Sequence, residues 1–394
     1  MAGTQPLNVG APPEVELSVV MPCLNEEAGI GGCIEQIAQT FAQHQIVGEI
    51  IVADNGSSDG SREIARGLGA HVVFAGEKGY GSALMAGIAA AQGTYIIMGD
   101  SDGSYDFAQI PAFLSKLRSG CDLVMGNRFQ GSIQAGAMPP LHKYFGNPVL
   151  TGIGRMFFKT DCHDFHCGLR GFTKTAYERM SLRTTGMEFA SEMVVKASLL
   201  NLRTCEVPTT LSRDRRTGRS HLRSWHDGWR HLRFLLLYSP RWLFLYPGLT
   251  FLFAGIAIGV WLLSGSGKDE HIFLDLHALL YAVAAILIGF QVALFAVFTK
   301  IFAITEGLHP HDPKLGRVFQ FFNLEKGLLS GTALLVLGSS IAFYSLIVWN
   351  RTGFGSLNSV IAVRLAAVAI TMIVLGVETI FSSFFLSILG LTRK

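Results

Sequence analysis

The chain has 394 residues, 49% of them hydrophobic, and its mean hydropathy of +0.38 is too high for an ordinary soluble enzyme of this length. Its net charge of +3 and the lack of a basic tract interleaved with aromatic residues in the first half argue against a nucleic-acid partner. The length allows a catalytic domain of about 200–250 residues and a second module. Nearly all long apolar runs lie after residue 243, so we expect a water-soluble part followed by a membrane part.

The N-terminal residues contain Pro and Gly and lack the basic start and apolar core of a signal peptide. We therefore expect a loose leader and a catalytic domain that begins in the cytoplasm. The six cysteines include no Cys-x-x-Cys pair, and in a cytoplasmic domain we expect them to be reduced thiols.

Apolar runs of strand length alternate with helical patterns in the first hundred residues. The expected strands are 17–21, 49–53, 71–75 and 95–98, and the expected helices end near 42 or span 61–68 and 82–91. This alternation predicts an α/β fold in which helices cover a mostly parallel, twisted sheet.

Acidic and amide side chains follow the ends of three of these strands, at Asn25-Glu26, at Asp54 and at Asp100-Ser101-Asp102. Ligands of parallel sheets bind at the carboxyl ends of the strands, so we expect these side chains to meet in one site. Asp100 and Asp102 can converge on a hard divalent cation, Mg²⁺ or Mn²⁺, that neutralises a departing diphosphate. Solvated turn aspartates are the alternative, and the coincidence of three strand ends favours the site.

Two further segments allow competing interpretations. The glycine-rich residues 77–82 include Lys78 and can open onto phosphates at a helix start, although an ordinary tight turn is the alternative. Two Cys and two His within residues 162–167 suggest zinc, but such closely spaced ligands cannot form a tetrahedron without strain. We expect this segment to be a strand whose side chains alternate between core and cleft.

Several motifs together resemble those of family-2 glycosyltransferases with the GT-A fold. The resemblance rests on 19–27 (VVMPCLNEE), 54–59 (DNGSSD) and 100–102 (DSD). The segments 125–129 (MGNRF), 164–170 (DFHCGLR) and 186–192 (GMEFASE) are similar to the dolichyl-phosphate mannose or glucose synthase branch. The similarity covers about residues 15–240.

The resemblance implies roles for individual residues. The donor nucleotide would be bound by Pro22, Asn25, Glu26, Asp54, Lys78 and Asp100, and the metal by Asp100 and Asp102. Ser104 stands where the family often has Gln, which leaves a third protein ligand open. The acceptor phosphate would be bound by Arg128, Lys143, Asn147, Arg216, Arg219 and Ser220, and the sugar or acceptor site would include Asp164, Arg170, Glu188 and Glu192. A solvated helix face is the alternative for the two glutamates, which lie one helical turn apart.

Four later apolar stretches, near 245–264, 276–298, 327–349 and 360–389, are each long enough to cross a hydrocarbon core of about 30 Å. Basic residues concentrate between the second and third stretches (Lys300, Lys314, Arg317, Lys326) and at the chain's end (Arg393, Lys394). The positive-inside rule then places both termini in the cytoplasm. We expect the membrane to be a bacterial inner membrane. Residues 221–243 mix arginines with tryptophans at helical spacing, which is typical of a helix at the membrane interface. The expected domains are 1–15 (leader), 16–220 (GT-A), 221–243 (interfacial) and 244–394 (transmembrane).

The resemblance implies an inverting transfer of a hexose from a GDP- or UDP-sugar to a membrane-bound polyprenyl phosphate. A phosphate monoester has a second pKa of about 6, so the acceptor is an anion at neutral pH and needs no strong base. The sequence leaves open whether the donor is of the GDP-mannose or UDP-glucose class, and whether the chain forms a homo-oligomer.

Three other functions are alternatives to this transfer. A processive polysaccharide synthase would carry Gln-x-x-Arg-Trp, but residues 239–242 read Ser-Pro-Arg-Trp and no such motif occurs. A direct protein or lipid A glycosyltransferase is a second enzymatic alternative. A non-catalytic membrane scaffold is a third, and the intact Asp100, Asp102 and Arg128 argue against it.

Overall fold

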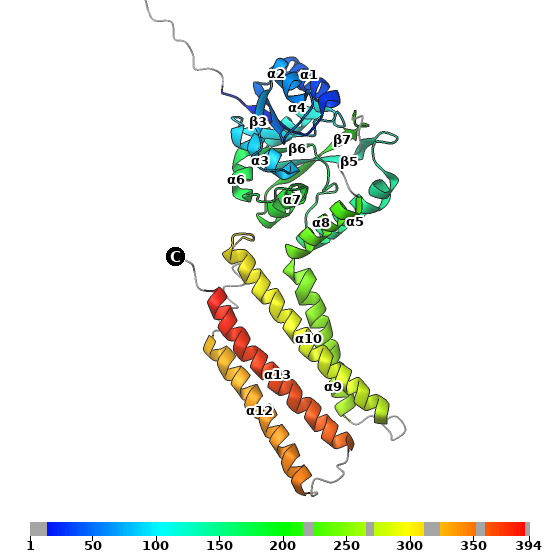
Figure 1. The fold of residues 1–394 in the computed structure, drawn as a ribbon, viewed down its shortest axis with the longest axis vertical. Helices are drawn as coiled ribbons and strands as arrows, with labels where there is room; N and C mark the ends of the chain where they lie inside the picture. Colours follow the sequence, from blue (N-terminus) through cyan, green and yellow to red (C-terminus); the bar gives the residue numbers. More distant parts are fainter. Residues whose placement is uncertain (1–13, 216–223, 265–271, 311–323, 352–358, 391–394) are drawn as a thin grey trace, which may run out of the picture. The chain divides into compact units, whose positions relative to one another are not determined.

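The computed structural model describes residues 14–215, 224–264, 272–310, 324–351 and 359–390. The chain forms two compact units, Met1–Tyr238 and Ser239–Lys394, which are described separately. The first is an α/β unit and the second is built from long helices (Figure 1).

The first unit contains a mixed seven-stranded sheet in the order β3-β2-β1-β4-β6-β5-β7. The strands are β1 Leu17–Cys23, β2 Gly48–Asp54, β3 His71–Phe74, β4 Tyr95–Met98, β5 Leu123–Ile133, β6 Arg170–Thr173 and β7 Thr204–Leu211. Neighbouring strands are parallel except β6, which runs antiparallel to both β4 and β5. The mostly parallel sheet expected from the sequence is confirmed, and its four predicted strands agree within two residues at each end.

Eight helices of the first unit surround this sheet (Figure 1). They are α1 Glu27–His44, α2 Ser61–Gly67, α3 Tyr80–Ala90, α4 Ile110–Arg118, α5 Asn147–Phe158, α6 Lys174–Met180, α7 Phe189–Leu199 and α8 Ser224–Leu237, with short turns η1 Phe107–Gln109 and η2 His142–Gly146. Side chains of a strand point alternately to its two faces. Val19 and Met21 of β1 therefore pack with α1 and α4, whereas Val20 packs with α3 and α7.

Two expectations are corrected here. Residues 161–167 form turns rather than a strand, because the buried Asp164 accepts hydrogen bonds from the backbone of Arg128 and His166 and folds the segment around itself. Cys121 and Cys205 form a disulfide, so these two are not reduced thiols. The pairing of β5 with β7 brings these residues, 84 positions apart, to a Cα–Cα distance of 6.2 Å. Cys23, Cys33, Cys162 and Cys167 are free and buried.

In the described part of the second unit, four helices are long and apolar enough to cross a membrane, which confirms the four expected stretches. They are α9 Tyr246–Leu263, preceded by η3 Arg241–Leu245, then α10 Ile272–Thr305, α12 Leu324–Arg351 and α13 Ser359–Leu389. Glycines allow close packing within two pairs of helices. A Cβ on Gly248 of α9 would lie 2.7 Å from the backbone of Ala293 in α10, and one on Gly331 of α12 would lie 2.9 Å from the backbone of Gly376 in α13. Small residues at such contacts are usual between helices in lipid.

Candidate active site

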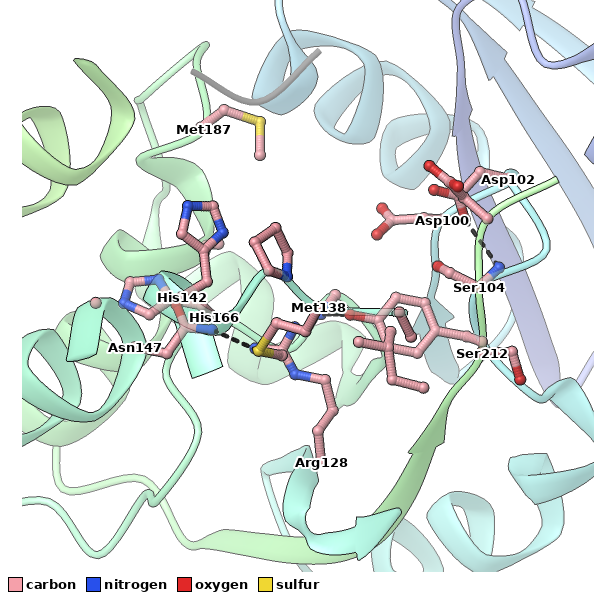
Figure 2. A pocket seen from close by; sticks show the side chains of 18 of the residues that line it. Asp100, Asp102, Ser104, Arg128, Met138, His142, Asn147, His166, Met187 and Ser212 are labelled. Atoms are coloured by element: carbon pink, nitrogen blue, oxygen red, sulfur yellow. Dashed lines mark hydrogen bonds between the residues drawn. The ribbon is translucent and has the colours of Figure 1, made fainter. Parts of the chain in front are cut away.

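A cavity of about 430 Å³ opens in the first unit beyond the carboxyl end of β4. Figure 2 shows the carboxylates of Asp100 and Asp102 on one side and Asn147, His142 and His166 on the other. Residues from the loop after β4, from β5, from η2–α5, from the turn before β6 and from α8 contribute to its wall.

The loops after β1 and β2 are joined by hydrogen bonds. The buried carboxylate of Asp54 accepts hydrogen bonds from the backbone of Gly56 and Ser57, both at 3.1 Å, and so fixes the loop after β2. Asn25, at a left-handed φ of 57°, accepts a 2.8 Å hydrogen bond from the backbone of Ser58. The backbone of Glu26, a buried residue, donates to Ser61 Oγ at 2.8 Å. The structure thus brings Asn25, Glu26 and Asp54 together, as expected for one edge of a site.

The Asp100–Asp102 turn is joined to these loops by its central residue. Ser101 Oγ donates a 2.7 Å hydrogen bond to the carbonyl oxygen of Pro22. Asp102 accepts from the backbone of Ser104 at 2.9 Å, and Tyr80 donates its hydroxyl to Asp100 at 3.0 Å. Burial and the neighbouring Asp100 raise the pKa of Tyr80 well above its usual value, so the phenol remains a donor.

Gly29 allows helix α1 to approach the Asp100–Asp102 turn closely. A Cβ at this position would lie 2.7 Å from the carbonyl oxygen of Ser101 and 2.9 Å from the Cα of Asp102. Both contacts are shorter than van der Waals distances between such atoms. The position therefore requires glycine if α1 and the carboxylate turn are to keep their places.

Arg128, which lines the cavity, forms a buried ion pair with Asp164. Arg128 Nε and Nη2 donate to the two carboxylate oxygens at 2.7 and 2.8 Å, and the backbone of Arg128 donates to Asp164 at 3.1 Å. Burial alone would lower the pKa of Arg128, but Tyr105 and Asp164 hold it well above its usual value. Arg128 is thus permanently charged, oriented and on the cavity wall, whereas Asp164 lies behind it.

Arg170 is fully buried and holds the turn before β6. Its guanidinium donates to the carbonyl oxygens of Cys167 at 2.7 Å, of Phe165 at 2.8 Å and of Ala190. These partners are neutral, so Arg170 brings a positive charge behind this wall. It is a positioning residue for the turn that carries His166.

Glu188 and Glu192 have partners inside the protein. Glu188 pairs with Arg230 of α8 at 2.9 Å. Glu192 is fully buried, pairs with Lys196 at 2.9 Å and accepts hydrogen bonds from Thr184 through its backbone at 2.8 Å and its hydroxyl at 2.7 Å. Burial would raise the pKa of Glu192, but Lys196 and Thr184 outweigh it and lower the pKa.

The loop that Glu192 holds reaches the glycine-rich segment before α3. The carbonyl oxygen of Thr185 accepts a 3.1 Å hydrogen bond from the backbone of Ser82 at the start of α3. Gly79, with a φ of 142°, donates its backbone N–H to Asn55 at 2.8 Å. Lys78 is exposed beside this contact.

Of the remaining residues expected to bind the acceptor, some lie on the cavity wall and others do not. Asn147 lies on the cavity wall and donates to Met138 Sδ at 3.5 Å, whereas Lys143 lies off the wall, with Nζ 5.5 Å from the ring centroid of Tyr144. Arg216, Arg219 and Ser220 lie outside the described residues. The segment leading to them is attached to the carboxylate turn, since the backbone of Arg215 donates to the carbonyl oxygen of Asp102 at 2.9 Å.

Sequence reasoning did not find His142, Tyr80 and His231 as parts of the site, and it did not assign His166 a role. Tyr80 adjoins the glycine-rich loop, which was the available signal. The three histidines belong to η2, α8 and the turn before β6, and their spacing in the chain gives no sign that they share a wall.

Comparisons with known proteins agree with this architecture. Residues 18–181 match the Glycosyl transferase family 2 domain, and residues 297–390 match the Glycosyltransferase family 2 C-terminal transmembrane region. The low-salt glycan biosynthesis hexosyltransferase Agl6 of Haloferax volcanii is 38% identical over 95% of this chain and 89% of its own length. The dolichyl-phosphate hexose transferase of the same organism is 28% identical over 49% of this chain and 81% of its own length.

Two further proteins also match part of the chain. The glycosyltransferase AglJ of Haloferax volcanii is 33% identical over 45% of this chain, which spans 58% of that protein. Among solved structures, glucosyl-3-phosphoglycerate synthase from Mycobacterium tuberculosis is 21% identical, with a TM-score of 0.44 over 56% of this chain and 77% of that one. On its family matches and its long relative, the chain belongs to glycosyltransferase family 2 and is a membrane glycosyltransferase in which a GT-A domain is followed by four long apolar helices.

Proposed function

We propose that this enzyme transfers a hexose, with inversion, from a GDP- or UDP-sugar to a polyprenyl phosphate at the cytoplasmic face of a membrane. The observation that carries the proposal is one cavity that has a carboxylate pair, Asp100 and Asp102, on one side and is also lined by the guanidinium of Arg128 (Figure 2). Such a cavity can hold two anionic substrates apart while the sugar lies between them.

The donor would bind where the loops after β1, β2 and β4 meet. Asp54, Asn25 and Glu26 would form the nucleoside side, with Pro22 and Lys78 beside them. The carboxylates of Asp100 and Asp102 fit a divalent cation, because both are hard oxygen ligands on one turn at the cavity wall. Among the described residues no third His, Cys, Asp or Glu completes a cluster, so water and a diphosphate would supply the other ligands. When bound, the cation would neutralise charge on the departing diphosphate.

The acceptor phosphate would bind at the opposite wall. Asp164 orients the guanidinium of Arg128, and Asn147 presents a side-chain amide from α5. Because the acceptor is an anion at neutral pH, these residues need only position it for in-line attack on the anomeric carbon. An α-linked donor would then give a β-linked product. Lys143 would attract the phosphate from a distance, and Arg216, Arg219 and Ser220 would close over both phosphates.

A lipid acceptor is favoured by the outer side of η2–α5, whose inner side lines the cavity. Its large apolar side chains are exposed to an extent uncommon in a soluble domain, Tyr144 at 74%, Phe145 at 58% and Met156 at 50%. Helix α8 likewise exposes Trp225 at 82% and Trp229 at 57%, while Phe234 is buried. Aromatic and basic side chains of this kind suit a lipid headgroup layer. The relative named a dolichyl-phosphate hexose transferase agrees with such an acceptor.

The proposal extends to the organisation of the whole chain. The chain would consist of four parts in this order: a leader (1–15), the GT-A domain (16–220), an interfacial segment (221–243) and the transmembrane part (244–394). Both termini would lie in the cytoplasm of a bacterial cell. Basic residues between the second and third spans support this orientation.

The test supplies the full-length protein with radiolabelled nucleotide-sugars and undecaprenyl phosphate. We expect label in an organic-extractable, mild-acid-labile lipid, for one class of donor and only with Mg²⁺ or Mn²⁺ present. Label in an insoluble polymer would support a polysaccharide synthase instead, and no transfer by folded protein would support a scaffold. NMR of the product decides the stereochemistry, and an α-linkage would reject inversion.

A further inference from the structure

Three histidines from distant parts of the first unit line the cavity on the wall opposite the carboxylate pair. His142 belongs to η2, His166 to the turn before β6 and His231 to α8. The rings of His166 and His231 meet edge to face with centroids 4.7 Å apart, and Figure 2 shows His142 beside His166. We call these three residues the imidazole wall.

His166 is the member of the imidazole wall with an unused nitrogen. Its Nε2 is buried and has no hydrogen-bond partner among the described residues, whereas His231 Nδ1 is 2.9 Å from Ser191 Oγ. A buried polar atom without a partner costs free energy, of the order of 1–3 kcal/mol. Because His166 lines the cavity, a ligand oxygen that reached this nitrogen when the site filled would give it the missing hydrogen bond.

The charged groups around His166 determine whether an anion or a cation would bind there. Arg170 lies behind the turn with neutral hydrogen-bond partners, so its positive charge has no carboxylate partner in the described part of the chain, whereas the charge of Arg128 is paired with Asp164. Burial, then His231, Arg128, Arg170 and His142, lower the pKa of His166 well below its usual value, so the ring is neutral at pH 7. A neutral ring donates one N–H without adding to the positive charge already present. Cations behind a neutral donor favour an anion.

We infer that His166 Nε2–H hydrogen-bonds the phosphate of the lipid acceptor, with His142 and His231 as its neighbours on the imidazole wall. This inference rests on the proposed function. It adds His166 to Arg128 and Asn147 as a residue that binds the acceptor phosphate. The position across the cavity from Asp100 and Asp102 keeps this phosphate away from the diphosphate of the donor (Figure 2).

Two matched substitutions separate hydrogen bonding from packing. The amide of Gln reaches the place of Nε2, whereas the shorter amide of Asn ends near the place of Nδ1. We expect His166→Asn to raise the KM for undecaprenyl phosphate about tenfold or more, since a hydrogen bond to a charged group is lost. His166→Gln should stay within about threefold of the wild type, and the KM for the nucleotide-sugar should stay within about twofold in both.

His163→Asn is the control, because this histidine is in the same turn but largely exposed and paired with Glu206. His163→Asn should change neither the KM for undecaprenyl phosphate nor the KM for the nucleotide-sugar. Thermal unfolding of all three full-length variants shows whether each remains folded. Equal losses in His166→Asn and His166→Gln, or equal effects on both substrates, would overturn the inference.

Binding without turnover distinguishes the two proposals. A short-chain prenyl phosphate is titrated into wild-type and His166→Asn protein and followed by ³¹P NMR, with inorganic phosphate as a second ligand. We expect wild type to bind the prenyl phosphate more tightly than inorganic phosphate and His166→Asn to lose most of that binding. Equal binding by both proteins contradicts the role of His166 and leaves the proposed function standing. If wild type binds nucleotide-sugar but no prenyl phosphate, the proposed function itself fails.

Discussion

The two sides of the cavity are built differently. The proposed donor side consists of three loops that each follow directly from a parallel strand. The loop after β4 lines the cavity, and hydrogen bonds Asn25–Ser58 and Ser101–Pro22 join it to the loops after β1 and β2. The acceptor side gathers β5, η2–α5, the turn before β6 and α8 from across the sequence. The donor side is therefore encoded in short motifs, whereas the acceptor side exists only in the folded chain. Mutations should affect the two sides differently.

The largest effect is expected on the donor side, at Asp102. Replacing Asp102 by Ala removes one of the two carboxylates proposed to hold the cation, and we expect kcat to fall by about 10³-fold or more. The fold should survive, because the Asp102 side chain accepts the backbone N–H of Ser104 within its own turn and belongs to no strand or helix. Steady-state turnover and thermal unfolding measure the two effects. Residual activity within about tenfold of the wild type would reject the metal assignment.

The donor side is also the part that the sequence predicts best. Strand ends at Cys23, Asp54 and Met98 agree with the expectation because alternating apolar runs are local signals. The antiparallel β6 and the turn at 161–167 were not predictable in the same way. Asp164 fixes that turn through contacts with Arg128, 36 positions earlier, and no local pattern shows such a contact. The disulfide between Cys121 and Cys205 and the imidazole wall depend on long-range packing for the same reason.

The second prediction tests the ion pair that orients the acceptor side. Arg128→Ala should weaken use of the lipid phosphate far more than nucleotide binding, and it leaves Asp164 buried and unpaired. Breaking such a pair costs about 3–5 kcal/mol of stability. The double variant Arg128→Ala with Asp164→Asn removes the unpaired charge, so it should recover stability without recovering acceptor binding.

Thermal unfolding and separate KM values for the two substrates measure this difference. If the double variant regained acceptor binding together with stability, Arg128 would have only a structural role. If donor and acceptor were affected equally by the single variant, the division of the cavity into two sides would be wrong.

The third prediction concerns the link between the sides, the loop held by Glu192. Glu192→Gln leaves Lys196 without its carboxylate, and we expect a loss of about 2–3 kcal/mol of stability at pH 7. The folded-state pKa of Glu192 is lowered, so its stabilisation is complete above the ordinary value of 4.5 and is lost as the pH falls through the lower folded-state pKa. The difference in Tm between wild type and variant should therefore narrow in acid. A difference that stayed constant or grew below pH 4.5 would contradict this assignment.

The smallest effects on the acceptor KM are expected at Lys143 and Asn147, two residues of the same helical segment. Lys143 lies beside Tyr144 and off the cavity wall, so it can act on the phosphate only through long-range attraction. Salt screens such attraction over about 10 Å at 0.1 M ionic strength. Lys143→Ala should therefore raise the acceptor KM by no more than about twofold at low salt and leave it unchanged at high salt.

Asn147→Ala removes a neutral side chain from the wall, where direct contact is insensitive to salt. We expect an increase of about tenfold in the acceptor KM, the size expected for one lost hydrogen bond to a charged group, at every salt concentration. The two variants are compared by measuring acceptor KM across a salt series in the same membrane preparation. A larger, salt-independent effect at Lys143 would show that this side chain turns into the cavity when the acceptor binds, and the acceptor side would then form only in the presence of its substrate.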